Sequence, residues 1–239
     1  RSMMITNTVM SSIARQVEEG IYQRVGQEVS VASTKAFTSQ MTLILMLAIL
    51  LGRKNNLSVM EAKGYIKQLR YLPKLVEDTL EVCRAGASRV ACSAQMISNC
   101  TFVGRQYMYP IALEGALKLK ELCYISTHGY STGELKHGPI AHMCDMYIFV
   151  APEKGMIDKN ITAMKEIKSR RGRIALIKQR GQEFPKDCYD DLIEIPKAKD
   201  YILPILATIP MQLIPLYLAK AKKYNIDKPR NLAKSVTVE

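Results

Sequence analysis

The pattern of hydrophobic positions changes near residue 100. Before that point apolar residues recur mostly at helical spacing, and after it short continuous apolar runs alternate with helical stretches. Continuous apolar runs of four to eight residues are typical of strands buried on both faces of a parallel sheet. The pattern therefore predicts a mainly helical first part followed by a doubly wound α/β domain.

The first part contains one unusually apolar segment. Residues 33–53 are apolar on most faces, so we expect one long, buried helix there. Pro73 interrupts a later helical pattern and predicts a break, because proline removes a backbone donor. The expected elements are helices over 11–19, 33–53, 58–82 (in two pieces) and 84–98, and a strand over 21–25.

The second part alternates strands with helices. The expected strands cover 100–104, 146–151, 173–177 and 192–195, and the expected helices cover 110–124, 161–169 and 203–224. In such sheets ligands bind at the carboxyl ends of the strands, near the point where the strand order reverses.

Cysteine usage argues against a metal site. The six cysteines include no CxxC pair and no histidine cluster beside them, so neither a zinc site nor a thioredoxin-like motif is expected. Scattered cysteines in a chain of 239 residues suggest buried thiols in a reducing compartment. We therefore expect a cytoplasmic protein.

The net charge of +12 suits an anionic metabolite, a nucleic acid or a membrane surface. The basic residues are spread out apart from 168–173, which we interpret as a solvated helix end, and no aromatic residues interleave with them. The apolar stretch 40–52 is shorter than the ~20 residues that span a bilayer. The stretch 201–219 carries three prolines and is interpreted as a buried, bent helix. We expect neither nucleic acid nor membrane as partner, and the start has no signal-peptide core.

Three segments carry candidate chemistry. The helix predicted at 110–124 carries Glu114, Lys118 and Glu121 on one face. These residues are either part of a ligand site or a surface salt-bridge ladder. His137 lies in a polar, glycine-bounded loop, where it could transfer protons or be structural. Hydroxyl residues from 33 to 39 begin the long helix, where they could bind an anion or simply cap the helix. Phosphate loops of the GxGxxG or Walker type and GxSxG elbows are absent from the sequence.

Four strings together resemble one enzyme family. VASTKAFTSQ (31–40), YPIALEGALKLKEL (109–122), GELKHGP (133–139) and DKPRNLAKSVTVE (227–239) are similar, in order and separation, to the isomerase half of the glutamine:fructose-6-phosphate amidotransferases, the isomerising glucosamine-6-phosphate synthases. The resemblance covers essentially the whole chain. It implies conversion of fructose 6-phosphate, with glutamine-derived ammonia, to glucosamine 6-phosphate.

The resemblance also implies an architecture of two sugar-isomerase (SIS) domains with flavodoxin-like parallel sheets, the first incomplete here and the second complete. The implied parts are 1–57 for the end of the first domain, 58–88 for a helical connection, 89–224 for the second domain and 225–239 for a catalytic tail. The family's glutaminase domain and its serine-rich phosphate loop are absent from this sequence. We therefore expect this chain alone to lack full activity.

The resemblance assigns roles to individual residues. It implies that Lys234 forms a Schiff base with the open-chain ketose, that Glu121 moves a proton between C1 and C2, and that Lys118 assists. His137 matches a ring-opening histidine that the neighbouring subunit lends, which implies a homodimer. The implied sugar contacts are Val31, Ser33 and Ala233. Neither a metal nor another cofactor is implied, and the alternative is a non-catalytic SIS module that only binds a phosphosugar.

Overall fold

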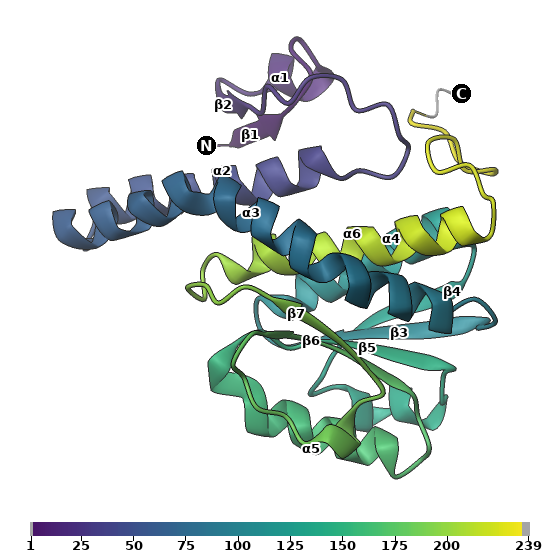
Figure 1. Ribbon diagram of the computed structural model, residues 1–239. Coiled ribbons are helices and arrows are strands. Elements are labelled where there is room, and N and C mark those ends of the chain that lie inside the picture. Colours follow the sequence, from purple (N-terminus) through teal and green to yellow (C-terminus); the bar gives the residue numbers. More distant parts are fainter. Residues whose placement is uncertain (1, 236–239) are drawn as a thin grey trace.

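Five parallel strands form the central sheet of the computed structural model, which describes residues 2–235 (Figure 1). The strands are β3 (Asn99–Gly104), β4 (Ser126–Ser131), β5 (Met146–Val150), β6 (Ile174–Gln179) and β7 (Asp191–Ile195). Their order across the sheet is β4-β3-β5-β6-β7, and every neighbouring pair is parallel. β4, the next strand in the sequence, lies on one side of β3 and β5 lies on the other, so the strand order reverses between β3 and β5.

Helices cover both faces of this sheet. α3 (Val59–Ser93), α4 (Met108–Cys123) and α6 (Leu203–Ala221) lie on one face, and α5 (Ile157–Lys168) lies on the other (Figure 1). Phe102 joins the core under α3, α4 and α6, whereas its neighbour Val103 joins the core under α5. Successive strand side chains point to opposite faces, so the central strand β5 is apolar and buried throughout. The predicted doubly wound α/β fold is confirmed. Four short 3₁₀ turns complete this part: Leu135–His137, Pro139–Ala141, Lys154–Met156 and Lys186–Cys188.

A small unit precedes these layers. β1 (Met3–Thr6) and β2 (Glu19–Tyr22) pair in parallel around α1 (Ser12–Gln16), and the Ser11 hydroxyl caps α1 by accepting from the Ala14 amide at 3.4 Å. A loop then leads into α2 (Lys35–Lys54).

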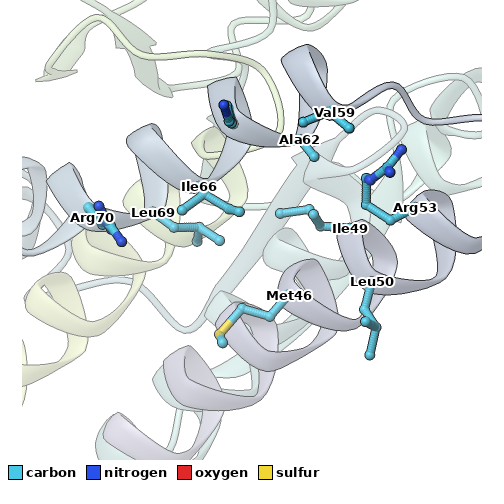
Figure 2. A pocket seen from close by; sticks show the side chains of 10 residues that line it. Met46, Ile49, Leu50, Arg53, Val59, Ala62, Ile66, Leu69 and Arg70 are labelled. Atoms are coloured by element: carbon cyan, nitrogen blue, oxygen red, sulfur yellow. The ribbon is translucent and has the colours of Figure 1, made fainter.

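The prediction that the long helix at 33–53 is buried is wrong, although the helix itself is present as α2. Ile49 is its one buried residue, and the side chains of Met46 and Leu50 are 51% and 57% exposed. α2 packs against α3 and α6, and Figure 2 shows Met46 and Ile49 facing Ile66 and Leu69 of α3 across a groove of about 570 Å³. Exposed apolar side chains remain on the rest of α2.

Two helices meet the length and hydropathy expected of a membrane span. In α6, 72% of the most apolar window is buried inside the protein, so α6 is a core helix. In α2 only 6% of the corresponding window is buried. The similarity of α2 to a membrane span rests on length and composition alone. Core helices of soluble proteins meet the same criteria.

The predicted break at Pro73 is also wrong, because α3 runs without interruption from Val59 to Ser93. Proline within a helix removes one hydrogen bond and costs about 3 kcal/mol. Leu72 and Leu75 flank Pro73 and are both buried in the core that α3 shares with α6, and this packing offsets the cost. The expected domain boundary between residues 88 and 89 falls inside this helix, and the domain limits stay a prediction.

The carboxyl group of Glu153, after β5, is buried. Burial raises the pKa of Glu153 to about 8, against the opposing effects of its own backbone amide and of Arg105. Since this pKa lies above the ordinary value, the stabilising contribution of the bound proton is complete below about pH 4.5 and is lost as the pH rises through 8. Glu153→Gln should therefore raise the free energy of unfolding at pH 8 by a few kcal/mol and change it little at pH 4.5.

Urea unfolding at the two pH values measures this effect, and Glu183→Gln, at an exposed position, is the control. An equal change for both variants at pH 8 would contradict the assignment of the effect to Glu153.

Candidate functional site

The carboxylate-lysine ladder of α4 is buried. The ammonium group of Lys118 lies 2.9 Å from the Glu121 carboxylate and 3.4 Å from that of Glu114, and the Lys118 side chain is only 3% exposed. The interpretation of these residues as a surface salt-bridge ladder is therefore wrong. Separating the two groups would leave the buried Lys118 ammonium without its partner, which is costly. The ion pair therefore holds the Glu121 carboxylate in place.

The ladder does not lie at the carboxyl end of the preceding strand. α4 begins there with Met108, and Glu121 lies about 20 Å further along the helix at 1.5 Å per residue. Lys118 and Glu121 are therefore close to the opposite edge of the sheet, where β4 begins.

The loop before α2 approaches this ladder. Burial raises the pKa of the Glu114 carboxyl, Lys118 lowers it, and the negative charges of Glu121 and Glu28 raise it further. The effect of Glu28 on Glu114 places this loop carboxylate in the same electrostatic environment as the ladder, although the two are 86 positions apart in the sequence.

Glu28 caps the start of α2. Its Oε1 accepts hydrogen bonds from the backbone amides of Thr34, at 2.8 Å, and Ala36, at 3.2 Å. A carboxylate is well suited to the positive end of the helix dipole. The Thr34 side chain makes no capping hydrogen bond, so capping by Thr34 is excluded.

The other oxygen of Glu28 accepts a hydrogen bond from Lys234. The Nζ of Lys234 lies 2.9 Å from Glu28 Oε2 and 3.5 Å from the carbonyl oxygen of Val31. Burial works to raise the pKa of Glu28, but hydrogen bonds from Thr34, Lys234 and Ala36 outweigh it and hold the pKa at about 2. Glu28 is therefore ionised at neutral pH and holds the Lys234 ammonium at the loop.

The C-terminal segment is docked along 225–235 and is not frayed there. The Val31 amide donates to the carbonyl oxygen of Asp227 at 3.1 Å. The Arg230 amide donates to the Tyr124 hydroxyl at 2.9 Å, and the Arg230 guanidinium lies 4.4 Å from the centre of the same ring. Tyr124 directly follows α4, so these contacts bring the tail, the loop and the end of α4 together (Figure 1). Residues 236–239, the end of the matching string, lie outside the described residues.

The predicted site residues separate into two places. Lys234 is held at the Glu28 loop, which contains the predicted sugar contacts Val31 and Ser33, and Ala233 is next to it. The same tail contacts Tyr124, which follows Lys118 and Glu121 at the end of α4. His137 is exposed in the 3₁₀ turn beyond the carboxyl end of β4. The length of β4 separates it from Glu121 by about 20 Å at 3.3 Å per residue. A single chain therefore does not bring His137 to the other candidates.

Sequence reasoning missed Glu28. The only local signal was an acidic residue a few positions before a predicted helix start, which is the usual place for a capping carboxylate. Among residues 2–235 no group of three or more His, Cys, Asp and Glu side chains is arranged to hold a metal ion.

The fold and the site together define a class. A doubly wound parallel sheet with a buried lysine–carboxylate pair and a second lysine on a docked tail is suited to carbonyl chemistry on a small anion. The sequence model of the SIS domain matches residues 1–50 and 97–220, and the chain belongs to the SIS domain family.

The sequence relatives of this chain carry the name of one particular enzyme, whereas the family model names only a domain. Over 239 residues the chain is 41% identical to the glutamine–fructose-6-phosphate aminotransferase (isomerizing) of Chlorobaculum tepidum, and it is 39% identical to the enzyme of that name from Escherichia coli O157:H7. The alignments cover 99% and 100% of this chain but only 39% of each relative, so the chain spans about two fifths of their length.

Solved structures agree with this assignment. The C-terminal domain of glucosamine-fructose-6-phosphate aminotransferase from Francisella tularensis superposes with a TM-score of 0.88 at 30% identity, covering 95% of this chain and 64% of that one. Glucosamine-6-phosphate deaminase from Thermotoga maritima, at 22% identity and a TM-score of 0.71 over 99% of this chain and 66% of its own, shares the fold.

Proposed function

We propose that this chain is the later portion of the isomerase half of a glutamine–fructose-6-phosphate aminotransferase, acting on fructose 6-phosphate in the cytoplasm. The observation that carries the proposal is the meeting of the buried Lys118–Glu121 pair, the Glu28 loop and the docked Lys234. These groups come from three distant segments of a chain that is similar throughout to enzymes of that name.

Lys234 is the proposed nucleophile. Its amine adds to the C2 carbonyl of the open-chain ketose, and loss of water leaves an iminium ion that acidifies the hydrogens on C1. Attack requires the neutral amine, so a proton must first leave the Nζ that Glu28 and the Val31 carbonyl hold. At 43% exposure, the Lys234 side chain remains accessible to a substrate.

Glu121 is the proposed base. Ammonia, supplied by the glutaminase part of the longer relatives, adds to C2 and displaces the Lys234 amine, so that the imine nitrogen on C2 comes from ammonia. The Glu121 carboxylate takes a proton from C1 and returns one to C2, which leaves the amino group on C2 and an aldehyde at C1. Lys118, hydrogen-bonded to Glu121 at 2.9 Å, orients this carboxylate. No metal is needed, because the iminium ion withdraws the electrons.

His137 is proposed to act in the site of a second copy of the chain. Its exposure and its distance from Glu121 leave it free to reach another subunit, and a twofold dimer would pair each His137 with the partner's lysine. The dimer is the assembly that this role requires.

Subunit mixing tests the proposal. For these experiments the completed enzyme is this chain preceded by the N-terminal segments of a relative such as the C. tepidum protein. His137→Asn and Lys234→Met forms of the completed enzyme should each be inactive. Unfolding and refolding them together in equal amounts should restore about a quarter of normal turnover, because half of the dimers then carry one intact site. His137→Asn unfolded and refolded alone is the control. Equal restoration in this control would contradict a shared site, and so would the absence of restoration in verified mixed dimers.

A further inference from the structure

The side-chain nitrogen of Lys234 lies between two acceptors of the loop before α2. The Nζ is 2.9 Å from Glu28 Oε2 and 3.5 Å from the carbonyl oxygen of Val31. An ammonium group has three N–H donors, so one of them remains for a further partner. Because the Lys234 side chain is 43% exposed, a substrate can reach this nitrogen while the Glu28 carboxylate stays beside it.

The Glu28 carboxylate is fixed independently of Lys234. Its Oε1 accepts from the backbone amides of Thr34 and Ala36 at the start of α2, and the side chain is only 10% exposed. Against burial, which works to raise it, hydrogen bonds hold the pKa of Glu28 at about 2. A carboxylate with this pKa is too weak a base to take the proton of an ammonium group. Glu28 therefore places a constant negative charge beside the nitrogen.

Docking of the tail does not require this charge. The Ser30 hydroxyl donates to the carbonyl oxygen of Ile226 at 3.0 Å, and Arg230 contacts Tyr124 through both its backbone amide and its guanidinium. An ion pair with an exposed lysine adds little to stability. The usual helix caps are Ser, Thr, Asp and Asn rather than Glu. Neither docking nor capping therefore accounts for the use of a glutamate at position 28.

Other charged groups face the pair from α4 and from the loop itself. Burial raises the pKa of Glu114 in the α4 ladder, and the charge of Glu28 raises it further, but the carboxylates of the ladder are paired with its own lysine. The Nζ of Lys35 lies beside Gly26, two residues before Glu28. Within the described residues, Glu28 is the one carboxylate that forms an ion pair with Lys234. Its charge therefore acts most directly on this nitrogen.

The positive charge on the Lys234 nitrogen returns during the proposed reaction. When the neutral amine adds to C2, one proton passes from the nitrogen to the carbonyl oxygen, solvent supplies a second, and the oxygen leaves as water. The nitrogen keeps one hydrogen and carries the positive charge of the iminium ion. This charged form is far more electrophilic at C2 than the neutral imine, so ammonia adds readily only while the nitrogen stays protonated.

We propose that Glu28 is the counter-ion of the iminium ion at Lys234: its Oε2 accepts the remaining N–H and keeps the imine protonated until ammonia adds to C2. The carboxylate needs no rearrangement for this role, because the amides at the start of α2 already hold it in place. The inference rests on the proposed function, since it requires the imine at Lys234. It makes Glu28 a catalytic residue that contacts the reacting nitrogen.

Two reductants together measure how much of the imine is protonated in the completed enzyme, with fructose 6-phosphate present and glutamine absent. Borohydride reduces both forms of the imine, whereas cyanoborohydride reduces the protonated form. The ratio of the two adducts on Lys234, followed against pH, gives the midpoint at which half of the imine is protonated. In Glu28→Gln this midpoint should fall by about one pH unit or more, because a nearby opposite charge favours the charged form. Glutamine keeps an oxygen for the amides of Thr34 and Ala36.

Glu18→Gln, which removes the same charge at an exposed position, is the control and should leave the midpoint unchanged. Glu28→Asp keeps the charge but moves it away from the nitrogen, so its midpoint should fall by a smaller amount, and it decides the matter if Glu28→Gln fails to fold. An unchanged midpoint in the deciding variant, or an equal shift in Glu18→Gln, would overturn the inference and leave the proposed function standing. Absence of the borohydride adduct on Lys234 from the unsubstituted enzyme would overturn both.

Discussion

Lys234→Met in the completed enzyme should lower turnover of fructose 6-phosphate by on the order of 10⁴-fold or more, because no other group can then form the iminium ion. The substitution should cost little stability, since the Lys234 side chain is 43% exposed and forms one ion pair. Glucosamine 6-phosphate formation measures the effect, and Lys228→Met is the matched control on the same exposed tail.

Lys234→Arg separates chemistry from charge. Arginine can keep the ion pair with Glu28 but cannot form an imine, so it should be as inactive as methionine. Substantial activity in Lys234→Arg would mean that the residue acts only through its positive charge.

Glu121→Gln should lower turnover by about 10²–10⁴-fold, because the amide cannot take the proton from C1. Imine formation at Lys234 should persist, so this variant separates the two steps. The measurement is exchange of the C1 hydrogen of fructose 6-phosphate with deuterated solvent, followed by nuclear magnetic resonance.

Glu114→Gln is the control for Glu121→Gln. Glu114 contacts the same lysine, at 3.4 Å, but it has no assigned role in proton transfer. Its substitution should leave the exchange rate within a few-fold of normal. An equal loss in both variants would show that the ladder acts by maintaining structure and would remove Glu121 from the role of base.

The parts of the fold that depend on local pattern could be predicted from the sequence. β3, β5 and β6 are continuous apolar runs because both of their faces are covered. β4 was missed because it is an edge strand with polar residues, of which Thr127 is fully buried. Helical propensity likewise did not reveal that packing carries α3 through Pro73.

The site was predictable only in part, because its contacts are long-range. Spacing placed Glu114, Lys118 and Glu121 on one face but could not decide between burial and exposure, which depends on α6 and the Glu28 loop. Lys234 and Glu28 are more than 200 residues apart, and no local pattern connects them. The resemblance to known sequences identified Lys234, and the structure supplied its partner.

Reduction of the completed enzyme with borohydride in the presence of fructose 6-phosphate, followed by peptide mapping, tests whether Lys234 forms the Schiff base. We expect one sugar adduct per chain, on Lys234, and none in Lys234→Met. An adduct on Lys118 or another lysine, or the absence of any adduct in an enzyme that turns over, would contradict it.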